Sequence, residues 1–549
     1  MKSKIITLSM VASIVAVPMF AKKTNNQQKS LRPNIVIILA DDMGYSDVGC
    51  YGGEIKTPNI DKLAKDGLRF TQFYNAGRCW PTRASLLTGY YYQAIRPSSA
   101  NNREEGWSRT IPQLLKPQGY RCYHSGKWNV FELPKPYTDA GFDRSYWVAN
   151  LLNQYDPKDF ENDVPIKYEN EAKKNYYTTI AITDHAIKEL KEHGTNYSHQ
   201  PFFLYLAYTS PHFPVQAPQE DIDKYKNTYQ DGWDKMRERR LVNLKKSGIV
   251  DCGLAELEPR ARWHYQDDKM LLDTLGPGEV FEARPWNTLN KEQQKFQSMK
   301  MSIHAAMVDR MDQEIGRVIR QLKEMGQFDN TVIFLLSDNG ASAEMLVRGR
   351  GHDKNVRPGS EDSHLCIGPG WALASNTPLR RSKAWVHEGG ISTPLIVHWT
   401  NGIKSKNEIR HNPGHLVDIL PTILELAGNI DPYSETSKDY PKLHGVSLVP
   451  SFYKDNSVIH DFIYFNHQGN YALRMGDWKL VTSELDKHQW GLYNLANDRS
   501  EKNDLSTKYP ERVKMMKAKW ENLTKEYKAQ NPHPTAAQNG FVKPKHYKH

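Results

Sequence analysis

Beyond its first 21 residues the sequence has no apolar run long enough to cross a membrane, which takes roughly 20 consecutive apolar residues. The apolar run from Ile5 to Val17 follows two lysines and leads to small residues around Ala21, a pattern typical of a secretory signal peptide. No cysteine directly follows this run, so a lipid anchor has no attachment point. We expect residues 1–21 to be cleaved and the mature chain to be secreted or periplasmic, without a membrane anchor.

Cysteine is also scarce. The 549 residues include five cysteines, which are Cys50, Cys79, Cys122, Cys252 and Cys366. Their number and wide spacing exclude a disulfide-dense scaffold and a clustered zinc site. An odd count in an exported chain leaves at least one thiol unpaired, and we expect that thiol to be Cys79.

The sequence shows no basic tail, no nucleic-acid-binding motif and no internal repeat. Its formal net charge is +10, but the lysines and arginines are interspersed with aspartates and glutamates. We therefore expect a mild attraction of anionic ligands and no nucleic-acid partner. Aromatic residues make up 11% of the chain, which favours a protein that handles sugars or other ring-shaped ligands, although such side chains also fill cores.

What the chain does contain is an alternation of buried strands and amphipathic helices. Apolar runs typical of buried strands occur at Ile35–Leu39, Pro201–His212, Thr331–Gly340 and Ser392–Thr400. The segment Ala305–Gly326 has the apolar periodicity of a helix that packs one face against a core. The alternation predicts an α/β fold, in which helices flank a mostly parallel central sheet of a large domain.

The pattern changes in two places along the chain. Between 221 and 297 it is lost among charged, proline and glycine residues, which indicates a long insertion over one face of the sheet. From 456 to 531, short alternating strands with a Gly-Asp turn and a terminal helix predict a small α+β subdomain with an antiparallel sheet. We expect a main domain at 32–455 that carries the insertion, and a frayed tail at 532–549.

Acidic residues follow two of the predicted strands. Asp41 and Asp42 end the first run, and Asp338 and Asn339 end the run that starts at Thr331. If these strands are neighbours in a parallel sheet, their carboxyl ends bring four oxygen ligands together. Oxygen ligands without cysteine or histidine suit Ca²⁺ or Mg²⁺. Taken singly, each motif is also typical of a helix cap or a turn.

A thiol lies at the predicted start of a helix in AGRCWPTRASLLTGYY, residues 76–91. Pro81 is typical of a first helical turn, and Gly89 is typical of a helix end. Cys79 is expected just before the first turn, where unpaired backbone N–H groups bind anions and activate a thiol. The stretch therefore predicts an oxyanion site beside a nucleophile.

The pattern Cys-x-Pro-x-Arg followed by LLTG resembles the signature of the formylglycine-dependent sulfatases of the alkaline phosphatase superfamily. The resemblance covers most of the chain, and its ordered motifs are PNIVIILADDMGYSDVGCYGG, TPNIDKLAKDGLRFTQFY, GYRCYHSGKW, SPHFP, DNTVIFLLSDNG, NTPLRRSKAWVHEGGISTPLIVHW and GDWKLV…LYNLANDRSEKNDL. The first pattern alone occurs by chance in many proteins, whereas the ordered set is highly specific. The sequence is similar to bacterial arylsulfatases and carbohydrate O-sulfatases, which implies an alkaline phosphatase-like fold.

The resemblance implies a sulfuric ester hydrolase whose nucleophile is made from Cys79. In the family a separate maturation enzyme oxidises this cysteine to formylglycine (3-oxoalanine), and the hydrated aldehyde attacks sulfur. Arg83 matches the arginine that steadies the hydrate. The resemblance assigns the metal, usually Ca²⁺ with Mg²⁺ as the alternative, to Asp41, Asp42, Cys79, Asp338 and Asn339.

The resemblance also implies roles for four further side chains. Lys127 and Lys383 match two lysines that hold sulfate oxygens, and His212 matches a histidine that protonates the leaving-group oxygen. These cations and the metal would neutralise the sulfate so that a nucleophile can approach sulfur. Asp338 is the expected proton acceptor of the attacking hydroxyl. The second hydroxyl would then expel inorganic sulfate as the aldehyde re-forms.

One position departs from the family pattern. The motif Gly-Lys-Trp is normally followed by a histidine that contacts the formylglycine hydrate, and here it is followed by Asn129. Asparagine forms hydrogen bonds but does not titrate near neutral pH. Either Asn129 keeps a positioning role at the substrate, or another base serves the second step. The substitution affects the expected turnover more than the expected sulfate binding.

Loops near the sheet edge are expected to contact the leaving group. Candidates are His352 and Asp353 in the loop 348–364, His387, and His467 from the C-terminal subdomain, although such residues also suit ordinary solvated surface. The leading hypothesis is a carbohydrate O-sulfatase that acts on a polysaccharide or host glycan. A broad arylsulfatase for sulfate scavenging, a phosphomonoester, phosphodiester or phosphonate hydrolase on the same fold, and a non-catalytic sulfoglycan-binding protein remain as alternatives.

Overall fold

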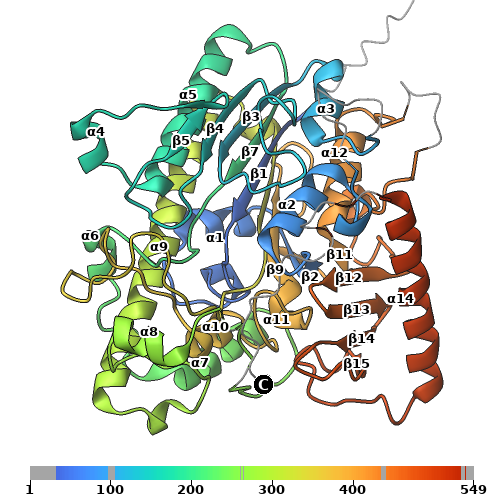
Figure 1. The fold of residues 1–549 in the computed structure, drawn as a ribbon. Helices are drawn as coiled ribbons and strands as arrows, with labels where there is room; N and C mark the ends of the chain where they lie inside the picture. Colours follow the sequence, from blue (N-terminus) through green and yellow to red (C-terminus); the bar gives the residue numbers. More distant parts are fainter. Residues whose placement is uncertain are drawn as a thin grey trace, which may run out of the picture.

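The computed structural model describes residues 32–96, 106–259, 261–263, 265–433, 440–532, 534 and 538. Figure 1 shows a large part built on a central sheet and, beside it, a smaller sheet lined by the last helix. The expected signal peptide at 1–21 and most of the expected tail at 532–549 lie outside the described residues. Within the described ranges, no helix combines the length and the apolar character that a membrane crossing requires.

The central sheet is built around β1 (Asn34–Ala40), a strand of seven buried residues. β1 pairs in parallel with β7 (Phe202–Ala207) on one side and with β8 (Thr331–Ser337) on the other. The strand order is β10-β2-β9-β8-β1-β7-β3-β4-β5-β6, and β11 pairs with β2. The remaining strands of this sheet are β2 (Leu68–Tyr74), β3 (Arg121–Gly126), β4 (Arg144–Val148), β5 (Asp159–Glu161), β6 (Val164–Pro165), β9 (Ser392–His398), β10 (Glu408–Arg410) and β11 (Gly414–His415).

The prediction of a mostly parallel sheet is confirmed. The exceptions are β9, which is antiparallel to both β8 and β2, and the antiparallel edge formed by β5 and β6. β1, β3, β7 and β8 all run in the same direction. Because parallel strands end at one edge of a sheet, the segments that follow these four strands converge there.

Helices cover both faces of the sheet, and successive side chains of β1 point to opposite faces. Val36 and Ile38 pack into one core with residues of α1, α5 and α9. Ile35 and Ile37 pack into a second core with residues of α2 and α12. The helices of the larger part are α1 (Pro58–Lys65), α2 (Cys79–Thr88), α3 (Ile111–Leu115), α4 (Asn170–Lys174), α5 (Thr178–Asn196), α6 (Gln219–Asp223), α7 (Gly232–Lys246), α8 (Asp268–Leu275), α9 (Lys291–Glu324), α10 (Pro369–Ser375), α11 (Glu388–Ile391), α12 (Ile419–Leu426) and α13 (Val449–Tyr453).

The expected insertion at 221–297 is more regular than its composition suggests. It contains α7 and α8, and Trp233 of α7 packs edge-on against Trp286 and Trp371, with ring centroids 4.8 Å and 5.5 Å apart. These rings belong to the core on the α9 face of the sheet. The segment therefore contributes to the main core and is more than a surface addition.

Helix α9 begins 14 residues before the predicted start at Ala305, at Lys291. Asn290 caps it, because its side chain accepts a hydrogen bond from the Gln293 backbone (2.9 Å) and the Gln293 side chain accepts one from the Asn290 backbone (3.1 Å). The first turns, KEQQKFQ, carry few apolar residues. Hydrophobic periodicity therefore marks only the later, buried part of this helix.

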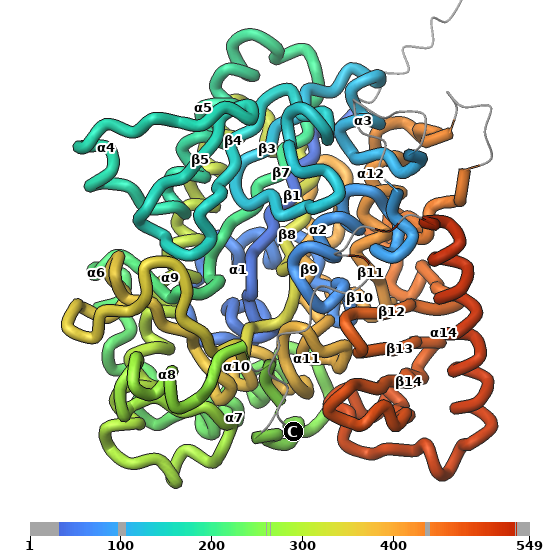
Figure 2. The backbone as a smooth tube through the Cα atoms, in the orientation of Figure 1, coloured from blue at the N-terminus to red at the C-terminus, as the bar shows by residue number. Residues whose placement is uncertain are grey.

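The C-terminal part forms a separate antiparallel sheet in the order β12-β13-β14-β15. As expected, a Gly-Asp turn at Gly476 and Asp477 joins two of its strands. Figure 2 shows this sheet, in orange to red, at one side of the large part, with α14 along it. The elements are β12 (Ile463–His467), β13 (Asn470–Met475), β14 (Trp478–Thr482), β15 (Gly491–Asn494) and α14 (Pro510–Gln530).

Candidate active site

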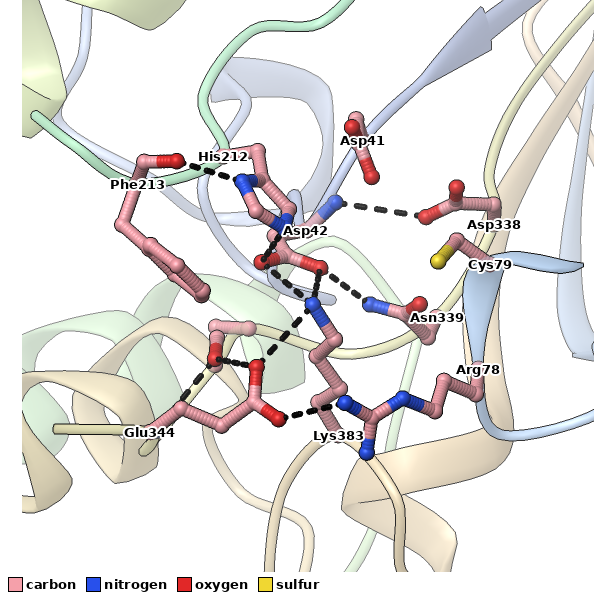
Figure 3. Close-up of polar contacts among 12 residues, drawn as sticks. Asp41, Asp42, Arg78, Cys79, His212, Phe213, Asp338, Asn339, Glu344 and Lys383 are labelled. Atoms are coloured by element: carbon pink, nitrogen blue, oxygen red, sulfur yellow. Dashed lines mark hydrogen bonds and ion pairs between the residues drawn. The ribbon is translucent and has the colours of Figure 1, made fainter. Parts of the chain in front are cut away.

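The acidic residues that follow β1 and β8 lie next to each other. The register pairs Ala40 with Ser337, so that both strands end at the same level and the chains continue into Asp41 and Asp338. The backbone N–H of Asp42 donates a hydrogen bond to Asp338 Oδ1 over 3.3 Å, and Asn339 Nδ2 donates one to Asp42 Oδ1 over 2.7 Å (Figure 3). The structure therefore brings together the four side chains that the sequence pattern predicted to converge.

Two lysines neutralise the first two carboxylates. Lys127, which follows β3, places Nζ 2.6 Å from Asp41 Oδ2. Lys383, from the segment between α10 and α11, places Nζ 2.8 Å from Asp42 Oδ1. Burial opposes ionisation of Asp41, but the nearby positive charges, with Lys127 the largest of them, together hold the pKa of Asp41 below its ordinary value. All four side chains are at most 3% exposed, so these charges interact with little screening by water.

Arg83 holds the third carboxylate. Its Nε and Nη2 lie 3.0 Å and 2.7 Å from Asp338 Oδ2, and its Nη1 donates a hydrogen bond to the backbone carbonyl of Lys127 over 3.0 Å. Burial and the nearby charge of Asp41 nevertheless raise the pKa of Asp338 to about 7. Asp338 therefore binds a proton more readily than an ordinary carboxyl.

The donor atoms of this cluster fit a hard divalent cation. Asp41 Oδ1 and Asn339 Oδ1 are buried and have no hydrogen-bond partner, which is costly unless another positive group contacts them. Ligand atoms of Asp41, Asp42 and His212 also lie within 4.8 Å of one another. Carboxylate and amide oxygens are the preferred ligands of Ca²⁺ and Mg²⁺. Asp41, Asp42, Asp338 and Asn339 are the residues that would hold such an ion.

Arg78 is the N-cap of α2 and Cys79 is its first residue. The helix therefore begins one residue earlier than the sequence suggested, so that Cys79 lies inside the first turn. Gly89 ends the helix in the left-handed region with φ of 75°, as predicted. The Cys79 side chain is buried, and Asn129 Nδ2 lies 3.0 Å from its Sγ. Figure 3 places Cys79 beside Asp338 and Asn339. The thiol thus lies next to the oxygen cluster, at a helix N-terminus that favours anions.

His212 approaches the cluster from the segment after β7. Its Nδ1 donates a hydrogen bond to the carbonyl of Phe213 over 2.5 Å, and its Nε2 lies 3.6 Å from Asp42 Oδ2 (Figure 3). With Nδ1 engaged by a carbonyl, Nε2 is the nitrogen that exchanges a proton. Burial lowers the pKa of His212, and the neighbouring Asp42 opposes that shift.

A cavity of about 550 Å³ lies beside the side chains described above. Cys79, Lys127, His212 and Lys383 line it together with Asn129. Much of the remaining wall is aromatic, from Trp80, Phe131, Phe213, Trp263 and Tyr265, and polar or aliphatic side chains complete it, from Arg78, Leu151, Leu152, Gln266, Glu344, Leu346, Arg348 and Gln468. The cavity therefore joins an oxyanion-binding group to an aromatic region that suits an organic leaving group.

The four proposed leaving-group residues do not line this cavity. His352 Nδ1 accepts a hydrogen bond from the His364 backbone, and Asp353 accepts one from the backbone of Asn355, so both side chains stabilise their own loop. The loop 348–364 contributes Arg348 to the cavity lining.

His387 and His467 also lie outside the cavity lining. His387 is the buried N-cap of α11, and its Nδ1 lies 3.2 Å from Arg381 Nη1. His467 packs against Trp80, with ring centroids 5.6 Å apart, and the next residue, Gln468, lines the cavity. The C-terminal sheet does reach the site, but it does so one residue further along the β12–β13 turn.

Glu344 and Tyr265 were not singled out from the sequence. Glu344 lies 2.8 Å from Arg78 Nη2 and 3.2 Å from Lys383 Nζ (Figure 3). It also accepts a hydrogen bond from the hydroxyl of Tyr265 over 2.6 Å. Burial raises the pKa of Glu344, but the charges of Arg78 and Lys383 and the hydrogen bond from Tyr265 together hold it below its ordinary value. These residues come from segments without a recognisable motif, so no local signal identifies them.

A family model described as Sulfatase matches residues 33–430. The chain belongs to the sulfatase family. It is a sulfuric ester hydrolase. A second model, described as the C-terminal part of N-sulphoglucosamine sulphohydrolase, matches residues 381–529 and so covers the antiparallel sheet and most of α14.

Three curated relatives are similar over most of their length. An uncharacterized sulfatase of Schizosaccharomyces pombe is 32% identical, over 89% of this chain and 92% of the relative. An arylsulfatase of Klebsiella aerogenes is 30% identical, over 80% of this chain and 96% of the relative. An N-acetylglucosamine-6-O-sulfatase of Bacteroides thetaiotaomicron is 26% identical, over 97% and 93%. These relatives place the chain among enzymes that hydrolyse sulfate esters.

Solved structures share the fold. A structure described in complex with its substrate D-glucosamine-2-N,6-O-disulfate has a TM-score of 0.60 at 22% identity, over 91% of this chain and 99% of that one. A phosphonate monoester hydrolase of Agrobacterium radiobacter has a TM-score of 0.55 at 17% identity, over 90% and 96%. Because one architecture serves both kinds of ester, the fold alone does not select the substrate.

Proposed function

We propose that this sulfatase is exported and removes sulfate from an O-sulfated carbohydrate, using a formylglycine made from Cys79. The observation that carries the proposal is the position of Cys79: it is buried at the N-terminus of α2, 3.0 Å from Asn129, and lines one cavity with Lys127, His212 and Lys383. A nucleophile and several oxyanion-binding cations therefore face the same space.

The cations would bind and orient the sulfate. Lys127 and Lys383 line the cavity, and each is held in place by a carboxylate. Their ammonium groups offer donors that neutralise negative charge on the sulfate oxygens. A Ca²⁺ or Mg²⁺ ion held by the oxygen cluster would add a further positive charge that polarises the sulfate.

The proton transfers fall to the carboxyl and imidazole groups of the site. Asp338 would take the proton of the hydroxyl that attacks sulfur, while the bond from sulfur to the sugar oxygen breaks. His212 Nε2 supplies a proton to that oxygen, so that the sugar leaves as an alcohol. The second hydroxyl would pass its proton to His212, which the first step leaves neutral, so that the C–O bond to sulfate breaks as the aldehyde re-forms. Water adds to the aldehyde and restores the hydrate.

Asn129 fits a positioning role in this sequence of steps. It has φ of 49°, in the left-handed region where asparagine is among the most common non-glycine residues. Its amide Nδ2 faces the Cys79 side chain, so it would donate a hydrogen bond to the oxygen that replaces sulfur. It offers no titratable group for the second step.

The aromatic wall of the cavity supports a sugar as the leaving group. Trp80, Trp263 and Tyr265 offer rings for the apolar faces of a pyranose, and Gln468 offers an amide for its hydroxyls. The relative named N-acetylglucosamine-6-O-sulfatase and the neighbour bound to a sulfated glucosamine support the same class. Export rests on the signal-like segment at 1–21 and predicts a mature N-terminus near residue 22 in secreted or periplasmic material.

Sulfate release from a panel of defined esters tests the proposal. The matured enzyme is expected to hydrolyse at least one sulfated sugar faster than 4-nitrophenyl sulfate, and to release sulfate in preference to phosphate from matched esters. Hydrolysis of aryl sulfates with no sugar turned over would contradict the carbohydrate assignment. Faster phosphate release would contradict the sulfate assignment, and tight sugar binding by fully modified enzyme without any turnover would indicate a binding protein.

A further inference from the structure

Arg348 is the one cation of the cavity wall whose charge has no carboxylate partner among the described residues. Arg78, Lys127 and Lys383 each pair with a carboxylate oxygen, at 2.8 Å, 2.6 Å and 2.8 Å. Arg348 is exposed, and its guanidinium carbon lies 5.6 Å from the ring centroid of Tyr265. The lining therefore keeps an uncompensated positive charge that is positioned by an aromatic ring.

A chain of contacts places Arg348 beyond the sulfate-binding residues. Lys383 Nζ lies 3.2 Å from Glu344 Oε2, and the Tyr265 hydroxyl donates a hydrogen bond to Glu344 Oε1 over 2.6 Å. The guanidinium of Arg348 in turn packs over the Tyr265 ring. Arg348 is thus separated from Lys383 by one carboxylate and one aromatic ring, on the wall where the leaving group would lie.

The chemistry of this position selects an anionic leaving group. A guanidinium binds sulfate or carboxylate oxygens through parallel N–H donors, and stacking on a ring limits its orientations before the ligand arrives. A neutral sugar would leave this charge unpaired, although water would still solvate it. A leaving group with its own negative charge would pair with Arg348 while the reacting sulfate occupies the lysines.

We propose that Arg348 is a specificity-determining residue that binds a second anionic group, so that the substrate is a sulfated sugar carrying a further sulfate or a carboxylate. This inference rests on the proposed carbohydrate function and adds the charge of the leaving group. In both cases Arg348 binds an oxyanion. This oxyanion is either a second sulfate on the same sugar or the carboxylate of a neighbouring uronate.

Binding to the mature protein carrying Cys79→Ser, produced without a maturation enzyme, tests this inference, because this variant has no aldehyde hydrate to turn the ester over. The three probes are N-acetylglucosamine 6-sulfate, glucosamine-2-N,6-O-disulfate and a monosulfated disaccharide that contains a uronate. Calorimetry with Ca²⁺ present gives the dissociation constants. The same titrations are made after adding Arg348→Gln, Arg348→Lys or Arg350→Gln. Arg350 is a matched control, since it is exposed, carries the same charge and does not line the cavity.

The parent is expected to bind at least one doubly anionic probe more tightly than the singly sulfated one. Arg348→Gln should weaken that binding roughly tenfold, as expected for a hydrogen-bonded charged group, with the singly sulfated probe changed by less than about twofold. Arg348→Lys should recover part of the loss, and Arg350→Gln should change none of the three constants. Whichever doubly anionic probe loses affinity identifies the source of the second anion.

Equal weakening of all three probes by Arg348→Gln, or no change in any, would overturn the inference and leave the carbohydrate function standing. A parent protein that binds none of the three sugars would contradict the carbohydrate function itself. Catalysis supplies an independent readout: in the matured enzyme, Arg348→Gln should raise KM for the selected substrate and leave its kcat within about twofold, because Arg348 does not touch the reacting atoms.

Discussion

Replacing Arg83 tests whether this buried arginine holds Asp338 and the backbone of Lys127 in place. Arg83 is fully buried and makes three short contacts: two with Asp338 Oδ2, at 3.0 Å and 2.7 Å, and one with the Lys127 carbonyl, at 3.0 Å. Arg83→Lys keeps the charge but replaces a planar fork by a single ammonium. Arg83→Met keeps much of the volume and removes the charge.

The contacts set the expected order of destabilisation. A lysine ammonium cannot reproduce the fork that serves both Asp338 and the Lys127 carbonyl, so at least one hydrogen bond to a charged group is lost, worth about 1.5–3 kcal/mol. Arg83→Met removes the cation beside buried Asp338, and breaking a buried ion pair in this way costs about 3–5 kcal/mol. The free energy of unfolding should therefore fall from wild type to Arg83→Lys and further to Arg83→Met.

Urea unfolding followed by circular dichroism measures this order, with Ca²⁺ held constant and Arg350→Met as the control. Arg350 is 58% exposed, so its loss should change the free energy of unfolding by less than about 1 kcal/mol. Sulfate release per modified Cys79 should fall with both Arg83 variants. Equal stability of wild type, Arg83→Lys and Arg83→Met would refute the role of Arg83 as the cation that anchors Asp338.

Four further changes have defined outcomes. Asn129→His should change kcat for sulfate release while KM stays within about twofold, because it adds a titratable group beside residue 79 and leaves the lysines in place; a change in KM alone would contradict the positioning role. Gln468→Ala should raise KM for a sulfated sugar several-fold and leave 4-nitrophenyl sulfate hydrolysis unchanged, and an equal effect on both would contradict sugar contact. Chelation of divalent ions should abolish sulfate release, and Ca²⁺ or Mg²⁺ should restore it; activity that survives metal-free dialysis would exclude a required metal. Asn290→Ala should lower the free energy of unfolding by about 1 kcal/mol through loss of the α9 cap without affecting KM, and an unchanged urea midpoint would show that this cap contributes nothing.

The core of the fold, the oxygen cluster and the position of Cys79 at a helix start follow from local sequence signals, whereas Lys127, Lys383 and His212 were assigned only by the family resemblance. The apolar runs that became β1 and β8 end in acidic residues, and a parallel register is enough to bring Asp41 next to Asp338. Proline and glycine marked both ends of α2 correctly, to within one residue at its start. These features are readable because strand periodicity and helix capping act over a few neighbouring residues.

The leaving-group side depends on tertiary placement, which no local pattern records. His387 has the residue type of a sugar ligand, but its backbone position at the start of α11 turns it toward Arg381. Tyr265 and Gln468 reach the cavity from the irregular segment before α8 and from a turn of the C-terminal sheet. Neither segment has a periodicity that indicates its orientation, so these contacts emerged only from the fold.

The mass of the peptide that spans Cys79 shows whether this residue becomes the formylglycine nucleophile. The protein is co-expressed with a formylglycine-generating enzyme, and the same preparation is assayed for sulfate release. An aldehyde in place of the thiol is predicted, with activity proportional to the modified fraction and absent from Cys79→Ala. Sulfate release by protein whose Cys79 is entirely thiol, or complete modification without release from any sulfate ester, would contradict the account.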